Sequence, residues 1–364
     1  MAILRTMTRR AKDMTAGIGT AASTLTVAAG NVRGLMAFAV SKGADPAALA
    51  ARAGIDPAAL HDQDNRIAFP SYVALMRAGQ ALCGDPALAL HYGEAVDLSE
   101  VSIVGLIGNA SETMLHAFAQ LNRYGRLVVE FDGPAERFTL ATIDGELWGR
   151  DHRGNPNDFP ELTETTFARF VSAARRFGLP QLVKALHVTH GAPPHAADYA
   201  RIFQAPVTFN SDRNAMLLDP ACLTFPLQLQ PRYVFGVLSE RADALLKSLE
   251  KSKTARGRVE NLLMPILHTG EVGMEAVAAK MGVNRQILFR KLKAEGTTFE
   301  QVLDALRHTL ALHYLSGKKA SVNETVYLVG FSDPAPFSRA FKRWTGSSPR
   351  ALRAAPPEND ADVA

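Results

Sequence analysis

The last third of this 364-residue chain carries one short pattern twice, and that duplication limits the fold more than any other feature. Residues 274–293 predict a helix, a sharp turn at Gly282 and a second helix that begins after Asn284. Glycine adopts positive φ without steric cost, and asparagine is a favoured N-cap. The apolar side chains recur at helical spacing and can share one small core: Val277, Met281, Ile287, Leu288 and Leu292.

Residues 325–344 repeat this arrangement, with a turn at Gly330 and a second helix after Asp333. Pro334 and Pro336 fit that helix if Asp333 is its N-cap, because N–H groups in the first turn have no intrahelical partner. A glycine and a late proline in the following run, residues 345–349, mark the end of the helix.

A helical segment without Gly or Pro joins the two copies, from Thr298 to Ser316. A helix of that length spans roughly 28 Å at ~1.5 Å per residue. A helix-turn-helix protein reads DNA with its second helix, the recognition helix, in the major groove. Two recognition helices on one face of a duplex stand about one turn apart, roughly 34 Å. The joining helix can therefore hold both copies against successive segments of the major groove.

The formal net charge of +4 is unevenly distributed along the chain. Residues 251–353 hold 17 Lys and Arg against 8 Asp and Glu, whereas residues 1–250 hold 23 against 25 and residues 354–364 hold three acids. A basic region attached to a nearly neutral one is typical of a protein with one nucleic-acid-binding module. The charge distribution by itself is also explained by basic helix faces that are merely exposed to solvent. The two helix-turn-helix patterns favour DNA binding over that explanation.

A short basic helix after a glycine turn is the element that a helix-turn-helix inserts into the major groove. Arginine pairs bidentately with guanine and glutamine with adenine, so Arg285, Gln286 and Arg290 are the predicted base readers. Asp333 is expected to cap its helix. The remaining predicted DNA-binding residues stand at the helix starts or would meet phosphate: Asn284, Ser332, Lys291, Lys293, Ser338, Arg339, Lys342 and Arg343.

Aromatic side chains also occur in the two second helices. Phe289, Phe337, Phe341 and Trp344 could stack on bases, but aromatic residues at helical spacing more commonly belong to a core. We therefore predict that these four side chains pack inside the domain.

Residues from about 255 to 353 resemble the DNA-binding domain of the AraC/XylS family of bacterial transcription regulators. The paired helix-turn-helix units, the long joining helix and one long run carry the resemblance: Gly330-Phe331-Ser332-Asp333, then Phe337-Ser338-Arg339-Ala340-Phe341-Lys342-Arg343-Trp344-Thr345-Gly346-Ser347-Ser348-Pro349. The resemblance implies an all-α C-terminal domain that binds promoter DNA and recruits or blocks RNA polymerase, with activation as the favoured outcome.

Helical patterns dominate residues 31–125, and strand patterns follow. Asp45 and Pro46 predict a helix start, with the aspartate as cap and the proline at the first helical position. Residues 126–131 and 137–142 predict a β-hairpin around the turn cluster Asp132-Gly133-Pro134. The order continues as α+β, with helices over 160–177 and 199–203 and strands over 183–189, 207–209 and 215–218.

This order resembles the arabinose-binding-type N-terminal domain of one branch of the AraC family. The matching residues are Ala53-Gly54-Ile55-Asp56-Pro57, Arg66-Ile67, Gly84-Asp85-Pro86-Ala87-Leu88-Ala89-Leu90, and Phe203 with Pro206-Val207 and Phe209. The resemblance implies a domain that senses a small molecule, with homodimerisation as one option. The domain's name does not imply arabinose, and the sequence identifies no effector-binding residue.

These patterns divide the chain into five expected parts: a frayed or disordered start (1–30), an α+β ligand-sensing domain (31–235), a linker (236–258), the double helix-turn-helix domain (259–353) and a disordered tail (354–364). Within the linker we expect a helix over 238–249 and a loose, charged hinge over 251–258.

The sequence contains no Gly-x-Ser-x-Gly elbow, phosphate-binding loop, dinucleotide fingerprint or His-Glu-x-x-His motif. Asp151, His152 and Arg153 stand near Glu161 in the sequence, and these polar residues could be interpreted as an acid–base catalytic site. We expect instead that residues 149–158 form a solvated loop. No catalytic residue is therefore assigned.

No metal or cofactor is expected either. His187 and His190 should point to opposite faces of a strand and its end. Cys83 and Cys222 lack Cys-x-x-Cys spacing and are expected to be buried thiols in a reducing cytoplasm.

The sequence thus predicts a cytoplasmic one-component regulator rather than an enzyme. The predicted partners are promoter DNA, RNA polymerase and a small-molecule effector. No membrane association is expected, because no apolar run reaches the ~18 residues of a spanning helix. The alternative is an enzyme or metabolite-binding protein that carries the DNA-binding module for autoregulation.

Overall fold

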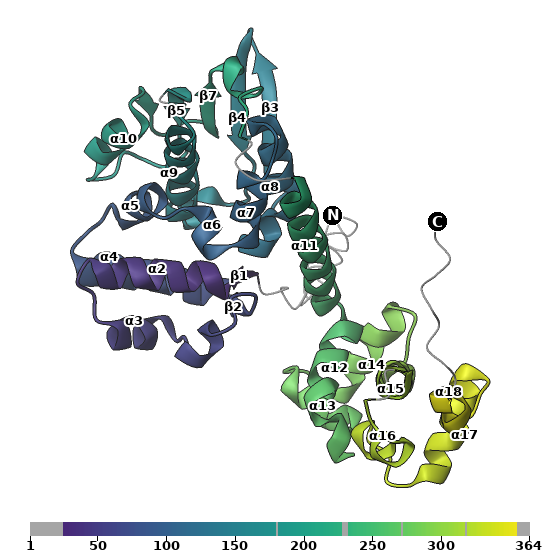
Figure 1. Ribbon diagram of the computed structural model, residues 1–364. Helices are drawn as coiled ribbons and strands as arrows, with labels where there is room; N and C mark the ends of the chain where they lie inside the picture. Colours follow the sequence, from purple (N-terminus) through teal and green to yellow (C-terminus); the bar gives the residue numbers. More distant parts are fainter. Residues whose placement is uncertain (1–24, 180, 228–231, 271, 317–318, 355–364) are drawn as a thin grey trace, which may run out of the picture. The chain divides into compact units, whose positions relative to one another are not determined.

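The computed structural model describes residues 25–354, apart from residues 180, 228–231, 271 and 317–318. The chain forms two compact units, Met1–Leu246 and Lys247–Ala364, whose boundary lies within helix α11 (Arg232–Lys253). The N-terminal unit combines helices with a five-stranded sheet, and the described part of the C-terminal unit is helical (Figure 1). The predicted fold class, α+β followed by all-α, is confirmed.

Helices make up most of the first half of the N-terminal unit. Asp45 accepts a hydrogen bond from the Ala48 N–H at 2.7 Å and Pro46 opens helix α3 (Pro46–Ala53), as the sequence predicts. Strands β1 (Thr26–Ala28) and β2 (Arg66–Ala68) form a separate antiparallel pair. The other elements are α2 (Ala29–Ser41), the 3-10 turn η1 (Pro57–Leu60), α4 (Phe69–Cys83), α5 (Leu88–Ala95), α6 (Leu98–Val101), α7 (Ile103–Asn109) and α8 (Met114–Val128).

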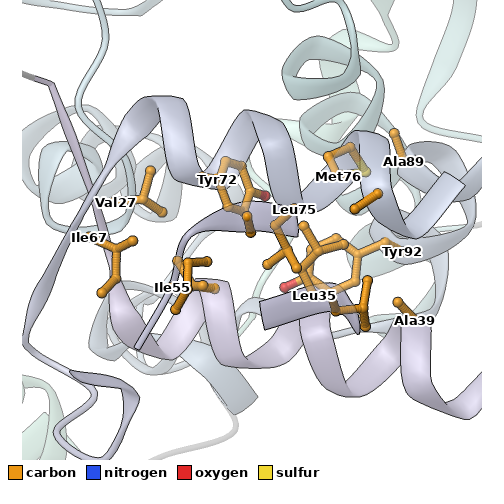
Figure 2. Packing of buried hydrophobic residues seen from close by; sticks show 14 of the residues in the cluster. Val27, Leu35, Ala39, Ile55, Ile67, Tyr72, Leu75, Met76, Ala89 and Tyr92 are labelled. Carbon is orange, nitrogen blue, oxygen red and sulfur yellow. The ribbon is translucent and has the colours of Figure 1, made fainter. Parts of the chain in front are cut away.

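These helices enclose the first hydrophobic core. Leu35 of α2, Leu75 of α4 and Tyr92 of α5 are fully buried in it (Figure 2). Helix α5 also packs closely on α9 (Glu161–Arg176). Gly93 permits this approach, because a Cβ at that position would stand only 2.4 Å from the Thr165 carbonyl oxygen. This contact joins the helical region to the sheet region.

The five-stranded sheet has the order β3-β4-β7-β5-β6. All neighbouring strands are antiparallel except β5 and β6, which are parallel. Helices α9 and α10 (Ala196–Phe203) share a second core with the sheet, which includes Phe167, Leu186 and Met216. The remaining bounds are β3 (Phe138–Ile143), β4 (Glu146–Asp151), β5 (Val183–His187), β6 (Val207–Thr208), β7 (Asn214–Leu218), η2 (Pro156–Asp158) and η3 (Pro220–Cys222).

The predicted hairpin is wrong by one element. Residues 126–128 continue helix α8, and the hairpin strands are β3 and β4, joined by Asp144 and Gly145 at φ of +52° and +80°. Asp-Gly is a favoured pair in tight hairpin turns, which need positive φ. The sequence offers two Asp-Gly pairs, and the one followed by Pro134 is the poorer hairpin turn because proline has no N–H to donate.

The predicted solvated loop over residues 149–158 is also wrong at its start. Residues 149–151 belong to β4, and the Asp151 carboxylate is buried against Arg137, which donates from Nε at 3.0 Å and Nη2 at 2.8 Å. Burial would raise the pKa of Asp151, but the charge and hydrogen bonds of Arg137 hold that pKa below its usual range. Arg153 is buried too and donates to the Phe159 carbonyl oxygen at 3.0 Å. Such charges are buried only with partners, since an unpaired one is costly.

Two expected domain boundaries differ from the structure. Residues 26–30 were assigned to a frayed start, yet Val27 is fully buried because β1 pairs with β2. The expected hinge over 251–258 is helical except at Thr254, whose Oγ1 accepts the Gly257 N–H at 2.9 Å and so caps α12 (Ala255–Leu263). Residues 1–24 and 355–364, which were expected to be disordered, lie outside the described residues.

Both cysteines are free thiols. Cys222 is buried, as predicted, and burial raises its pKa to about 11. Cys83 is only half-buried, and its Sγ lies 3.4 Å from the Ala39 carbonyl oxygen. None of the helices in the described ranges combines the length and hydrophobicity needed to cross a bilayer.

The C-terminal unit contains two small cores that share one long helix, α15 (Phe299–Ser316). Val302 and Leu306 enter the first core, and Ala311 and Leu315 enter the second. The other elements are η4 (Met264–Thr269), α13 (Met274–Lys280), α14 (Arg285–Ala294), α16 (Val322–Leu328), α17 (Pro334–Thr345) and α18 (Pro349–Ala354).

Candidate nucleic-acid interface

The first helix-turn-helix consists of α13 and α14, with the chain reversing at Gly282. Gly282 has φ of +69°, which glycine adopts without strain. The Asn284 side chain accepts a hydrogen bond from the Ile287 N–H at 2.9 Å and caps α14, as predicted. Four of the five predicted core residues are buried, whereas Ile287 is half-buried at the edge.

One face of α14 is exposed and basic. At ~100° per residue, five of its six exposed residues, all except Ala294, fall within an arc of about 140°: Arg285, Gln286, Phe289, Arg290 and Lys293. All three predicted base readers lie on this arc. Lys291 is half-buried and lies off it, so it faces away from the surface that the other basic residues share.

Phe289 is not a core residue, contrary to the prediction. Half of its surface, 50%, is exposed, and it stands between Arg285 and Lys293 on the basic face. The reason is the helix phase: Leu288 and Leu292 already fill the core side of α14, and the next residue after Leu288 is rotated away from it. Helical spacing alone could not separate these two neighbours.

Arg285 forms an ion pair with Glu275 of α13 at 2.9 Å. Both side chains are about two-thirds exposed, 66% and 67%. An ion pair this exposed contributes about 0–1 kcal/mol, so a guanine or phosphate can replace the carboxylate at little cost.

The second helix-turn-helix consists of α16 and α17. Asp333 accepts a hydrogen bond from the Ala335 N–H at 2.7 Å and Pro334 opens α17, as predicted. Phe337 and Phe341 are fully buried, as predicted, and Trp344 is partly buried against the same core.

The outward face of α17 carries the remaining predicted contacts. Ser338 is half-buried, and Arg339, Lys342 and Arg343 are exposed, all within an arc of about 140° along the helix. Ser332 is exposed beside the start of α17. Arg343 also reaches back to the joining helix, where its Nη2 lies 2.7 Å from an oxygen of Asp304.

Arg307 of α15 positions the second unit and was missed at the sequence level. Its Nε donates to the Val329 carbonyl oxygen at 3.1 Å and its Nη2 to that of Gly330 at 3.0 Å. The guanidinium also lies 4.5 Å from the Phe331 ring centroid. Burial lowers the pKa of Arg307 from its usual value. An arginine on the joining helix thus fixes the end of α16 and the turn before α17.

The two basic faces stand at the two ends of α15, which spans about 27 Å over its 18 residues. Side-chain caps define where α15 and the next helix begin. At the start of α15, the Thr298 side chain accepts the Gln301 N–H at 3.2 Å and the Gln301 side chain accepts the Thr298 N–H at 2.9 Å. Ser321 and Glu324 form the same reciprocal pair at α16. These local bonds fix the first turns of α15 and α16, the two helices that carry the second unit.

Two family models match this chain. The model described as the arabinose-binding domain of AraC transcription regulators, N-terminal, matches residues 43–227, which is more than half of the chain. A helix-turn-helix domain model matches residues 277–355, which covers both helix-turn-helix units except the first three residues of α13.

Curated relatives match over most of the chain. The ornithine utilization regulator of Pseudomonas aeruginosa is 29% identical over 302 residues, covering 82% of this chain and 87% of that protein. The regulator VirS of Mycobacterium tuberculosis is 22% identical and covers 86% and 92%. The transcriptional activator RhaS of Escherichia coli is 36% identical over 117 residues, covering 31% and 41%.

A solved structure, the transcriptional regulator CdpR from Pseudomonas aeruginosa, is similar at a TM-score of 0.35 and 22% identity, covering 73% of this chain and 86% of that one. The family models and the relatives identify regulators rather than enzymes. The chain belongs to the AraC family of transcription regulators, with an arabinose-binding-type ligand domain followed by a helix-turn-helix DNA-binding domain.

Proposed function

We propose that this regulator reads its operator with α14 and α17 in two successive segments of the major groove. One observation carries the proposal: two exposed, basic helix faces, each after a glycine turn, stand at the two ends of one long helix. A helix-turn-helix places its second helix in the groove, and the ~27 Å rod brings the two helices close to one DNA turn apart.

The residue roles follow from side-chain chemistry. Arg285, Gln286 and Arg290 would read base edges, because their side chains form bidentate pairs with guanine or adenine. Phe289, exposed among them, would contact the methyl group of a thymine. The other exposed cations of α14 and α17 would meet phosphate together with Ser338; these cations are Lys293, Arg339, Lys342 and Arg343. Asn284 and Asp333 hold the helix starts that direct these side chains.

A matched pair of variants tests these roles. Arg285→Ala should cost ~1–3 kcal/mol and relax base choice at one position of one half-site. Lys293→Ala should weaken binding evenly across sequences and make the salt slope shallower by about one. Fluorescence anisotropy against a set of single-base operator variants, at several salt concentrations, measures both.

Equal, sequence-independent losses in the two variants would contradict the assignment. Lys319→Ala, at an exposed lysine outside both recognition helices, serves as the control and should change neither readout.

We propose RNA polymerase and a second copy of the chain as further partners, and transcription activation as the outcome. The relative RhaS, named as an activator, supports the last point. A promoter reporter in cells that lack the gene decides it: expression should fall, and a rise would mean repression. Promoter DNA as the ligand implies that the protein works in the cytoplasm. Analytical ultracentrifugation with and without operator DNA tests for the dimer.

A small-molecule effector acting on the N-terminal unit completes the proposal, supported by the match to the ligand domain. One relative is named for ornithine utilization, which makes ornithine a first compound to test.

A further inference from the structure

The N-terminal unit contains a cavity of about 190 Å³. Helices α7, α8 and α9 and the strands β3, β4 and β7 all contribute to its wall. Most of the lining is apolar, and three phenylalanines from different elements meet there: Phe118 of α8, Phe138 of β3 and Phe170 of α9. An apolar cavity of about 150 Å³ is large enough to hold benzene, so this one has room for a ring or a short alkyl chain and a small polar group.

Three arginines line the cavity, and two of them are neutralised by the protein itself. Arg137 pairs with Asp151 at 2.8 Å, and Arg176 pairs with Asp97 at 2.9 Å. The third, Arg169, has no carboxylate within ion-pair distance among the described residues.

Arg169 is held in place, in part by a side-chain hydrogen bond with Tyr92, but one of its buried nitrogens lacks an acceptor among the described residues. Its Nε donates to the Val96 carbonyl oxygen at 3.3 Å, and its guanidinium lies 5.0 Å from the centroid of the Tyr92 ring. Its Nη2 is buried and has no hydrogen-bond acceptor in the described part of the chain. A buried guanidinium nitrogen without an acceptor is costly, so the wall carries one positive charge that a ligand can balance.

We propose that this cavity is the effector site and that its ligand is an amphipathic monocarboxylate, with the carboxylate on Arg169 and the apolar body among Phe118, Phe138 and Phe170. Guanidinium and carboxylate form short, charge-assisted, bidentate hydrogen bonds. A single unpaired arginine balances one negative charge, which favours a carboxylate over a phosphate monoester with its charge near two. This inference rests on the proposed effector control and adds the site and the ligand class.

The wall formed by α8 is linked to the helix that continues into the C-terminal unit. The Tyr124 hydroxyl donates to Oδ1 of Asp243 on α11 at 2.8 Å, and Arg123 donates to the same carboxylate at 2.9 Å. A ligand that shifts α8 would therefore act on α11, whose residues run from Arg232 to Lys253.

The test uses the full chain and probes that differ in the head group: octanoate and 3-phenylpropanoate, the neutral octanamide, the cationic octylamine, and ornithine. Isothermal titration calorimetry should show a carboxylate bound at least tenfold more tightly than octanamide. Octylamine and ornithine should bind more weakly still, because the apolar wall would have to desolvate their ammonium groups.

Variants separate the head group from the body. Arg169→Gln should remove the preference for octanoate over octanamide, while Arg52→Gln, at an exposed arginine on α3, should leave it unchanged. Ala173→Leu, which adds a side chain to the cavity wall without breaking α9, should weaken both probes at least tenfold.

Circular dichroism and operator binding are measured on the same preparations. Equal affinity for acid and amide, tighter binding of octylamine or ornithine, or no binding of any probe by a protein that still binds its operator would overturn the ligand proposal. That last result would leave the DNA-binding proposal intact, whereas loss of operator binding in the unmodified protein would reject the proposed function itself.

Discussion

Gly282 and Gly330 occupy equivalent turns, yet they face different surroundings. Both have positive φ, +69° and +77°. A Cβ on Gly282 would meet nothing within 4 Å, whereas one on Gly330 would stand 2.2 Å from the Leu267 carbonyl oxygen. The first glycine is therefore required only by its backbone conformation, and the second also by the approach of η4.

This difference predicts unequal costs of alanine at the two turns. Gly282→Ala should lower the free energy of unfolding by about 1–2 kcal/mol, the cost of left-handed φ for a residue with a Cβ. Gly330→Ala should have the same backbone cost, and the steric conflict with the Leu267 carbonyl oxygen should lower the free energy of unfolding by about 1–3 kcal/mol more. Urea unfolding in a Trp148→Phe background, where Trp344 is the one remaining tryptophan, reports on the C-terminal unit. Equal midpoints for the two variants would contradict the steric argument.

His195 should make stability depend on pH. Its Nε2 lies 3.2 Å from Oε1 of the buried Glu164, which also accepts the Tyr199 hydroxyl at 2.7 Å. The bond to Glu164 raises the pKa of His195 above 6.5. The protonated form is favoured in the fold, so this stabilisation is complete below about pH 6.5 and is lost as pH rises through the raised pKa.

We therefore expect the melting temperature to fall as pH rises above about 6.5 and through the raised pKa of His195, and to fall less in His195→Gln than in the unmodified protein. His268→Gln, at an exposed histidine, is the control and should retain the full pH dependence. Parallel pH profiles for the unmodified protein and His195→Gln would show that the ion pair does not contribute.

At the scale of elements, α15 does more than separate the two recognition helices. Arg307, near its middle, binds the two carbonyl groups that end α16 and begin the turn to α17. The second recognition helix is therefore oriented partly by a side chain of the joining helix, while α14 has its own contacts with α12 and α13 in the first core.

Arg307→Lys should consequently affect one half-site more than the other. Lysine keeps the charge but cannot bridge two carbonyl groups, because it lacks the planar guanidinium. We expect the lost hydrogen bonding to weaken operator binding by about 1–3 kcal/mol. Binding titrations with operators altered in one half-site at a time should place the loss at the segment read by α17. Arg350→Lys, an exposed arginine on α18, is the matched control, and an equal loss at both half-sites would exclude the positioning role.

At the scale of the whole molecule, the two helix-turn-helix units belong to one compact unit, because both cores take residues from α15. If the two recognition helices are rigidly connected, their separation fixes the spacing of the two half-sites. A flexible pair would tolerate any insertion that restores the same face of the duplex.

Operator insertions distinguish these cases. Adding about 5 base pairs between the half-sites turns the second one to the opposite face, and adding about 10 restores the face but lengthens the spacing by roughly 34 Å. Both insertions should reduce affinity to that of a single half-site, as measured by gel shift. Recovery with the longer insertion would indicate a flexible connection.

Much of the fold could be predicted because many side chains form hydrogen bonds with backbone groups only a few residues away. Asp45, Asn284 and Asp333 cap helices through N–H groups two or three residues away. The family of the DNA-binding domain and its predicted contact residues followed from such local patterns. The hairpin was misplaced because two Asp-Gly pairs compete locally and only strand pairing selects between them.

By itself, the sequence determined the capped helix starts at Asp45, Asn284 and Asp333, the two glycine turns and the basic faces of α14 and α17, since these depend on neighbours within one or two helical turns. Only the tertiary structure decided that Phe289 is exposed, that Arg307 binds the turn of the second unit, and that Arg169 lines a cavity without an acid partner. Those features arise from contacts, or from the lack of them, between segments far apart in the chain, and side-chain spacing along one segment carries no information about what another segment places against it.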